Sequence, residues 1–91
     1  MRIARRFIVR GRVQGVGFRY FAIRAARETG VVGTVRNVPD GTVEAIAEGS
    51  PAEVDAFRAA LEQGPSYARV DHVDEIELAS TGGYTSFDAV Y

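Results

Sequence analysis

Residues 31–63 read VVGTVRNVPDGTVEAIAEGSPAEVDAFRAALEQ, and this segment combines two alternating stretches with the signals of a helix. Two segments with alternating side chains, residues 31–37 and 42–48, flank the turn Pro39-Asp40-Gly41. Alternation on both sides of such a turn predicts an antiparallel β-hairpin over residues 31–48. The sheet therefore contains at least one pair of neighbouring strands that are also consecutive in the sequence.

A helix with complete start and stop signals follows the hairpin. Ser50 can cap the first turn, Pro51 takes the first helical position, and Glu53 completes a capping box. Gly64-Pro65 ends the helix, because glycine suits the residue after a helix and proline cannot continue it. Apolar residues at helical spacing predict one buried face, made of Val54, Phe57 and Leu61.

Upstream of the hairpin, a strand, a loop and a second helix are expected. Residues 5–10 alternate, with Phe7 and Val9 on one side, and predict a strand. Residues 11–17 contain three glycines and must form a loop. Residues 18–29 have helical period, and Gly30 is the expected stop. The apolar face of this helix consists of Phe18, Phe21, Ala22, Ala25 and Ala26.

Downstream, residues 70–78 predict a fourth strand, and the alternation of Phe87, Ala89 and Tyr91 predicts a short last one. The order is β-α-β-β-α-β plus a terminal strand. This order indicates an α+β fold, a ferredoxin-like sandwich whose antiparallel-rich sheet carries both helices on one face. No stretch has the composition of a linker, so we expect a single domain over residues 1–91.

The composition narrows the possible chemistry. With no cysteine, the chain has no disulfide, no thiolate nucleophile and no cysteine-ligated metal. The acidic residues are scattered and form no metal-binding motif. The one histidine, His72, falls in the predicted fourth strand, where we expect a structural or surface role. No apolar run has the length of a signal peptide or a membrane span, and the expected location is the cytoplasm.

Charge is distributed unevenly along the chain. Residues 1–36 hold nine arginines and one acid, a net charge of +8, whereas residues 37–91 hold two arginines and 11 acids, a net charge of −9. Such a division is compatible with a nucleic-acid surface or a site for a small anion. It is equally compatible with two halves that interleave in the fold and neutralise each other.

The loop over residues 11–17 is the best candidate for an anion site. Glycines allow the main chain to turn several N–H groups to one side, and the following helix adds the positive end of its dipole. Arg19 falls in the first turn of that helix, where a cation is unfavourable unless an anion lies beside it. Asn37 ends the second strand, which should run parallel to the first and end at the same edge. Either residue could also be structural, Arg19 as a surface arginine and Asn37 as a turn former.

One segment is far more specific than a generic glycine loop. The run Gly11-Arg12-Val13-Gln14-Gly15-Val16-Gly17-Phe18-Arg19, followed by Val32-Gly33-Thr34-Val35-Arg36-Asn37 and Asp40-Gly41-Thr42-Val43-Glu44, resembles the acylphosphatase family. The resemblance continues through Gly64-Pro65, Ala68-Arg69-Val70 and the Phe87-x-x-x-Tyr91 ending, so it covers nearly the whole chain.

The resemblance implies an activity and a set of site residues. Arg19 corresponds to the arginine that binds the substrate phosphate, and Asn37 to the asparagine that orients the attacking water. Main-chain N–H groups that help to bind the phosphate belong to Gln14, Gly15, Val16, Gly17, Phe18 and Arg19. The implied reaction is hydrolysis of an acyl phosphate to a carboxylate and inorganic phosphate, without a metal or cofactor. Inorganic phosphate is then both product and inhibitor, and nothing demands more than a monomer.

Two alternatives share the same expected fold. RNA-binding domains have this β-α-β-β-α-β order and stack bases on sheet aromatics. Strand aromatics are few here, Phe7 and Phe87 are expected in the core, and the net charge is −1, so nucleic acid is not an expected partner. The other alternative is a non-catalytic phosphate-binding or regulatory module, such as the acylphosphatase-like domain of larger hydrogenase-maturation proteins.

Overall fold

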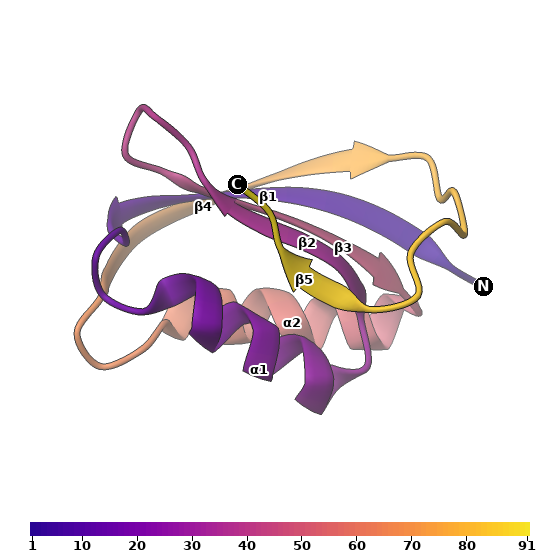
Figure 1. The fold of residues 1–91 in the computed structure, drawn as a ribbon. Coiled ribbons are helices and arrows are strands. Elements are labelled where there is room, and N and C mark those ends of the chain that lie inside the picture. Colours follow the sequence, from indigo (N-terminus) through magenta and orange to yellow (C-terminus); the bar gives the residue numbers. More distant parts are fainter.

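The computed structural model describes all 91 residues and confirms the expected order of elements. Five strands form one sheet, and both helices cover the same face of it (Figure 1). The elements are β1 (Ile3–Arg12), α1 (Phe18–Thr29), β2 (Val32–Asn37), β3 (Val43–Gly49), α2 (Pro51–Gln63), β4 (Arg69–Leu78) and β5 (Phe87–Ala89). The fold is therefore the ferredoxin-like α+β sandwich that the sequence predicts. Neither helix has the length and hydropathy of a membrane span.

The strand order across the sheet is β4-β1-β3-β2-β5. β1 and β2 both pair with β3 in antiparallel fashion, so they run in the same direction and end at the same edge. Asn37, the last residue of β2, is thereby brought to the edge where β1 leads into its loop. β5 pairs in parallel with β2, with Val35 opposite Ala89.

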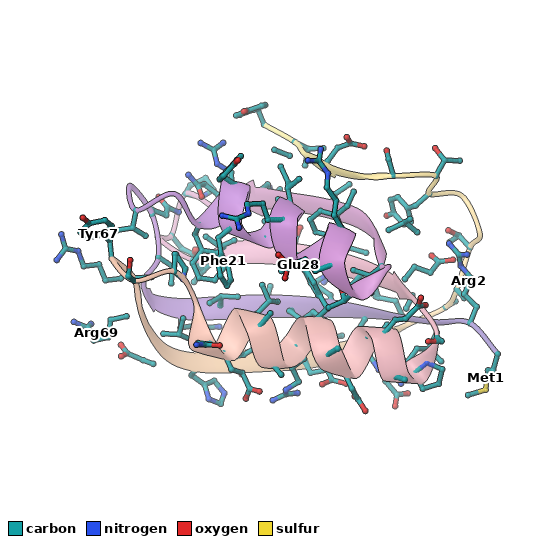
Figure 2. All side chains as sticks on the ribbon, turned by 90° about the horizontal axis from the view of Figure 1, so that it is seen from below. Met1, Arg2, Phe21, Glu28, Tyr67 and Arg69 are labelled. Carbon is teal, nitrogen blue, oxygen red and sulfur yellow. The ribbon has the colours of Figure 1, made fainter.

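The hydrophobic core lies between the sheet and the two helices. Phe57 of α2 packs between Phe7, with ring centroids 6.1 Å apart, and Phe87, with centroids 5.3 Å apart. Val54 and Leu61 are buried beside it, which confirms the predicted face of α2. On α1 the predicted face is also buried, apart from the partly buried Phe21, which lies on the helical side of the molecule (Figure 2).

The ends of β2, β3 and β4 agree with the sequence prediction to within one residue, whereas β1 and β5 differ from it by two residues. β1 is longer than residues 5–10, because its pairing with β4 continues past an irregularity at Arg10 and Gly11. β5 ends at Ala89 instead of reaching Tyr91, because it pairs with β2 over three residues only. One further main-chain hydrogen bond lies beyond the end of β5: the Val90 N–H donates to the Val35 oxygen of β2 at 2.9 Å.

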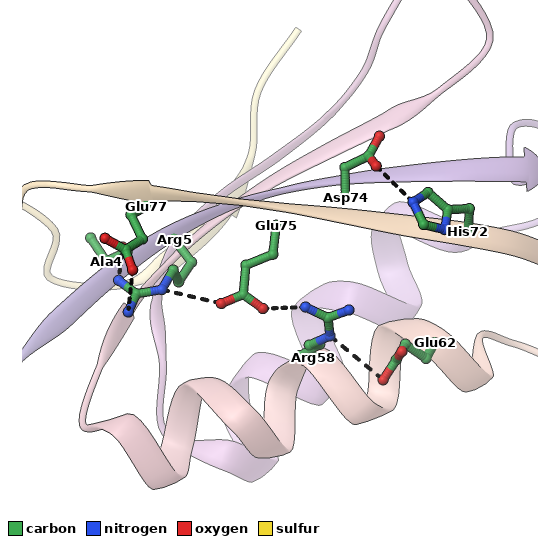
Figure 3. Close-up of polar contacts among 8 residues, drawn as sticks. All are labelled: Ala4, Arg5, Arg58, Glu62, His72, Asp74, Glu75 and Glu77. Carbon is green, nitrogen blue, oxygen red and sulfur yellow. Dashed lines mark hydrogen bonds and ion pairs between the residues drawn. The ribbon is translucent and has the colours of Figure 1, made fainter.

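The uneven charge is largely neutralised inside the fold. Arginines of β1 face acids of β3 and β4: Arg5 with Glu75, Arg6 with Glu44, and Arg10 with Asp74. Glu75 also pairs with Arg58 of α2, so an ion-pair chain joins β1, β4 and α2 (Figure 3). The two halves of the chain therefore interleave. Four arginines of the first half have no carboxylate partner: Arg12, Arg19, Arg24 and Arg27.

Candidate active site

The loop between β1 and α1 presents a row of unpaired main-chain N–H groups. Gly15 and Gly17 have φ angles of 74° and 77°, the left-handed region that glycine adopts without strain. Gly17 is the N-cap of α1 and offers no side chain to its first turn. No amide hydrogen of residues 14–20 is donated to an acceptor within the protein. Such N–H groups at the start of a helix favour the binding of an anion.

This loop borders a cavity of about 330 Å³. Four parts of the chain meet around it: the loop, the first two turns of α1, the end of β2, and the segment that continues β5. The lining residues are Val13, Gly15, Gly17, Phe18, Arg19, Tyr20, Ile23, Asn37, Ala89 and Tyr91. Arg19 and Asn37, distant in the sequence, therefore line one and the same cavity.

The Arg19 guanidinium is free to bind an anion. It forms no ion pair with a carboxylate, and the first turn of α1 contains no acidic residue. Its one defined contact is with Tyr91, whose ring centroid lies 4.9 Å from the guanidinium carbon. A cation over an aromatic face is attracted to the ring without losing its hydrogen-bond donors. Arg19 therefore lines the cavity with its charge uncompensated by a carboxylate.

The Asn37 side chain is half-buried and makes no hydrogen bond to the protein. Its carboxamide can both donate and accept, which is what binding a water molecule beside an anion requires. The main chain of Asn37 is fixed opposite Val43 in the β2–β3 ladder. A free amide on a rigid strand end can thus orient a small molecule in the cavity.

Not every residue of the predicted loop faces the cavity. Val16 packs against the hydrophobic core. Gln14 points toward the β2–β3 turn, where its Nε2 donates to the Val38 oxygen at 2.7 Å and to the Thr42 oxygen at 2.9 Å. Gly15, Gly17, Phe18 and Arg19 border the cavity directly. For Gln14 and Val16, only the main-chain N–H is available to a bound anion.

The sequence interpretation missed the apolar side of the cavity. Tyr20 and Ile23 come from the outer part of α1, and Ala89 and Tyr91 from the segment after Phe87. The alternation of residues 87–91 predicts a strand, but it contains no information on the neighbour of that strand. The parallel pairing of β5 with β2 is what brings Tyr91 toward Asn37. One local signal could have placed Ile23 near the cavity: it lies four residues after Arg19 in the helix, and residues at that spacing share a face.

His72 lies outside this cavity, as expected. It is exposed on β4, and its Nε2 lies 2.7 Å from Asp74 Oδ1 (Figure 3). The bond from Arg10 and the contact with His72 hold the pKa of the Asp74 carboxyl below its usual value. No cluster of three or more histidine, cysteine, aspartate or glutamate side chains is present. Arg19 and Asn37 are among the polar side chains that line the cavity.

Comparison with known proteins identifies a family with this arrangement. A family model described as Acylphosphatase matches residues 5–89. An acylphosphatase of Mannheimia succiniciproducens is 46% identical over 85 residues, which are 93% of this chain and 94% of that protein. The crystal structure of acylphosphatase from Bacillus subtilis superposes with a TM-score of 0.94 at 39% identity, covering 98% of this chain and 99% of the other.

The same fold also occurs inside a longer protein. HypF of T. kodakarensis superposes with a TM-score of 0.86 at 33% identity. The match covers 98% of this chain but only 12% of that protein. The fold alone is therefore compatible with a role as one part of a larger protein as well as with that of a small enzyme.

Proposed function

This chain belongs to the acylphosphatase family and hydrolyses acyl phosphates, and from that premise we propose which residues perform the reaction. Arg19 binds the phosphoryl group together with the main-chain N–H groups of residues 14–19. Asn37 orients the attacking water. The observation that carries this assignment is that Arg19 and Asn37 line one cavity beside a loop whose amides have no protein acceptor.

The reaction needs little more than these groups. The water oxygen attacks phosphorus, and the bond between phosphorus and the carboxylate oxygen breaks. One water proton passes to a phosphate oxygen, the other remains on the new hydroxyl, and the products are a carboxylate and inorganic phosphate. Phosphoryl transfer has a loose transition state with charge spread over the equatorial oxygens. Donors fixed around those oxygens stabilise it, and a carboxylate leaves without a strong general acid.

The guanidinium of Arg19 suits this role because of its shape. It is planar and always charged, and it can donate to two phosphate oxygens at once. The positive end of the α1 dipole acts on the same oxygens. The anionic substrate in turn relieves the unfavourable position of an arginine in the first turn of a helix. Charge complementarity thus favours the phosphoryl group over a neutral ligand.

The domain organisation, the location and the inhibition by phosphate are proposed on the same basis. Residues 1–91 act as one acylphosphatase-like domain, as a monomer in the cytoplasm. Inorganic phosphate, the product, inhibits by occupying the place of the phosphoryl group. No metal or cofactor takes part, since the groups that the reaction needs are supplied by Arg19, Asn37 and the loop.

The test is hydrolysis of benzoyl phosphate, measured with and without a metal chelator. We expect turnover that is insensitive to the chelator and inhibited by inorganic phosphate. Asn37→Ala should lower kcat by about 10²–10³, the usual loss for one positioned polar group. Gln63→Ala, at the exposed end of α2, serves as the control amide variant and should keep full activity. Near-normal turnover of a folded Asn37→Ala protein would contradict the role given to Asn37.

The nucleic-acid alternative receives no support from the aromatics. Phe7 and Phe87 are the aromatic residues of the strands, and both are buried against Phe57. The sheet face opposite the helices thus offers no phenylalanine, tyrosine or tryptophan ring on which a base could stack. Binding of RNA that weakens steeply with salt would argue for that alternative, and we expect none.

A further inference from the structure

The two halves of the proposed site come from strands that do not touch. The phosphate-binding loop follows β1 and Asn37 ends β2, but β3 lies between these two strands. Sheet hydrogen bonds therefore do not connect the loop directly to Asn37. The side chain of Gln14 does connect the loop to the turn that begins directly after Asn37.

Gln14 uses both hydrogens of its amide nitrogen for this connection. One bond goes to the Val38 oxygen at 2.7 Å, and the other to the Thr42 oxygen at 2.9 Å. Val38 directly follows Asn37, so the first bond acts one residue away from the proposed water-orienting side chain. Gln14 itself lies at the start of the loop, directly before Gly15. The side chain consequently spans from the phosphate-binding loop to the turn that follows Asn37.

The turn that receives these bonds is already closed on itself. The Val38 N–H donates to the Thr42 oxygen at 2.9 Å, and the Gly41 N–H donates to the Val38 oxygen at 3.0 Å. Thr42 donates from both its N–H and its hydroxyl to Asp40 Oδ1, and these bonds hold the pKa of Asp40 below its usual value. Gln14 thus bonds to a turn that is held by its own hydrogen bonds, so the position of the loop and the position of the turn are fixed relative to each other.

We propose that the side chain of Gln14 is a positioning residue that couples the phosphate-binding loop to Asn37. By fixing the distance between the loop and the turn after Asn37, Gln14 sets where the Asn37 amide stands relative to a bound phosphoryl group, and hence the line of attack of the water. This inference rests on the proposed function of Asn37 and adds a role for Gln14 that its main-chain N–H does not supply.

Glutamine suits this role because its amide nitrogen carries two hydrogen-bond donors, which glutamate and methionine, side chains of similar length, lack. A carboxylate cannot donate, so Gln14→Glu would face two carbonyl oxygens with a negative charge. Gln14→Met keeps the length and apolar part of the side chain and removes both donors. Because the turn keeps its own hydrogen bonds, Gln14→Met should remain folded while its coupling to the loop is lost.

The kinetic test compares Gln14→Met with the control Gln63→Met in the hydrolysis of benzoyl phosphate. We expect kcat to fall about 10- to 100-fold in the first, the usual effect of misplacing a reacting group by about 1 Å, and to be unchanged in the second. The KM and the inhibition constant for inorganic phosphate should change less than about threefold, because Arg19 and the loop amides remain.

A double variant separates positioning from a general structural defect. If Gln14 acts through Asn37, the double variant Gln14→Met with Asn37→Ala should be no slower than Asn37→Ala alone. Multiplied losses, or a raised KM with normal kcat, would show that Gln14 acts on phosphate binding or on folding, and would overturn the proposal.

A second measurement does not depend on turnover. The chain contains only three side-chain amides, Gln14, Asn37 and Gln63, so each NH₂ signal can be followed in a ¹⁵N NMR spectrum. Titration with inorganic phosphate should shift both Gln14 and Asn37 signals and leave Gln63 in place. In Gln14→Met the Asn37 shift should shrink by at least half.

The two tests fail in distinguishable ways. Full activity of Asn37→Ala would remove the proposed function of Asn37, whereas the phosphate-dependent shift of its signal could still report the coupling. An Asn37 shift that is the same in Gln14→Met and the unaltered protein would refute the coupling, whatever the activity.

Discussion

Glu48, a buried carboxylate at the end of β3, is expected to contribute strongly to the stability of the fold, and its substitution tests this. Its oxygens accept hydrogen bonds from Arg2 Nε at 2.9 Å, the Ser80 hydroxyl at 2.8 Å and the Gly82 N–H at 2.7 Å. The Glu48 side chain is fully buried, while Arg2 is half-exposed at one end of the molecule (Figure 2). One carboxylate thus ties the N-terminal segment and the β4–β5 connection to the sheet.

The size of its contribution follows from its pKa. Burial would raise the pKa of Glu48, but the bonds from Gly82, Ser80, Arg2 and Thr81 together lower it from 4.5 to about 2. A carboxyl with that change contributes at most about 3 kcal/mol at neutral pH. Solvent screening of the exposed Arg2 reduces this, so we expect about 2 kcal/mol. Since the folded pKa is depressed, this stability is complete above the unfolded value and is lost as pH falls toward about 2.

The assay is urea unfolding of Glu48→Gln beside the unaltered protein at several pH values. At pH 7 the midpoint should fall by roughly 1–2 M, given a slope of about 1–1.5 kcal/mol/M for a small domain. The difference in unfolding free energy between the two proteins should shrink steadily toward pH 2. Glu77→Gln is the control, because Glu77 is exposed and meets Arg5 only at 3.9 Å. A pH 7 difference below about 0.5 kcal/mol, or one that is independent of pH, would refute the reasoning.

The remaining predictions concern the arginine of the cavity and one helix cap. Arg19→Lys should lower kcat/KM for benzoyl phosphate by at least about 100-fold, because an ammonium cannot donate to two oxygens in the planar arrangement of a guanidinium. Kinetics that match those of the unaltered protein would contradict the role proposed for Arg19. Ser50→Ala should lower the free energy of unfolding by about 1 kcal/mol, since it deletes the 3.1 Å hydrogen bond that the Glu53 N–H donates to Ser50 Oγ. An unchanged urea midpoint would show that this cap does not contribute to stability.

Elements with local causes were predictable from the sequence. α2 begins after Ser50 because the capping box of Ser50 and Glu53 forms as its sequence predicts, with bonds of 2.8 and 3.1 Å. α1 likewise begins at Phe18 and ends at Thr29, where glycines on either side supply the left-handed φ angles that stop a helix. Arg19 and Asn37 reach one cavity because β1 and β2 are parallel, which the order of elements already implies.

Features with distant causes were not predictable. Glu48 looks like an ordinary member of an alternating strand, and its burial depends on Ser80 and Gly82, more than 30 residues later. The contact of Tyr91 with Arg19 requires knowing that β5 adds to the sheet beside β2. The Gln14 side chain acts across 24 residues on Val38, and no periodicity reports such a bond.

The groups proposed to hold the phosphoryl group are a guanidinium, one carboxamide and main-chain amides. Guanidinium stays charged and amides stay neutral across the whole range from about pH 4 to about pH 10. Any pH dependence of turnover in that range then comes from the substrate's own phosphoryl group, because these protein groups keep one protonation state. Mild acidification of the surroundings would leave these groups in the same protonation state, whereas a hydrolase that depends on a histidine base loses that base as its imidazole takes up a proton.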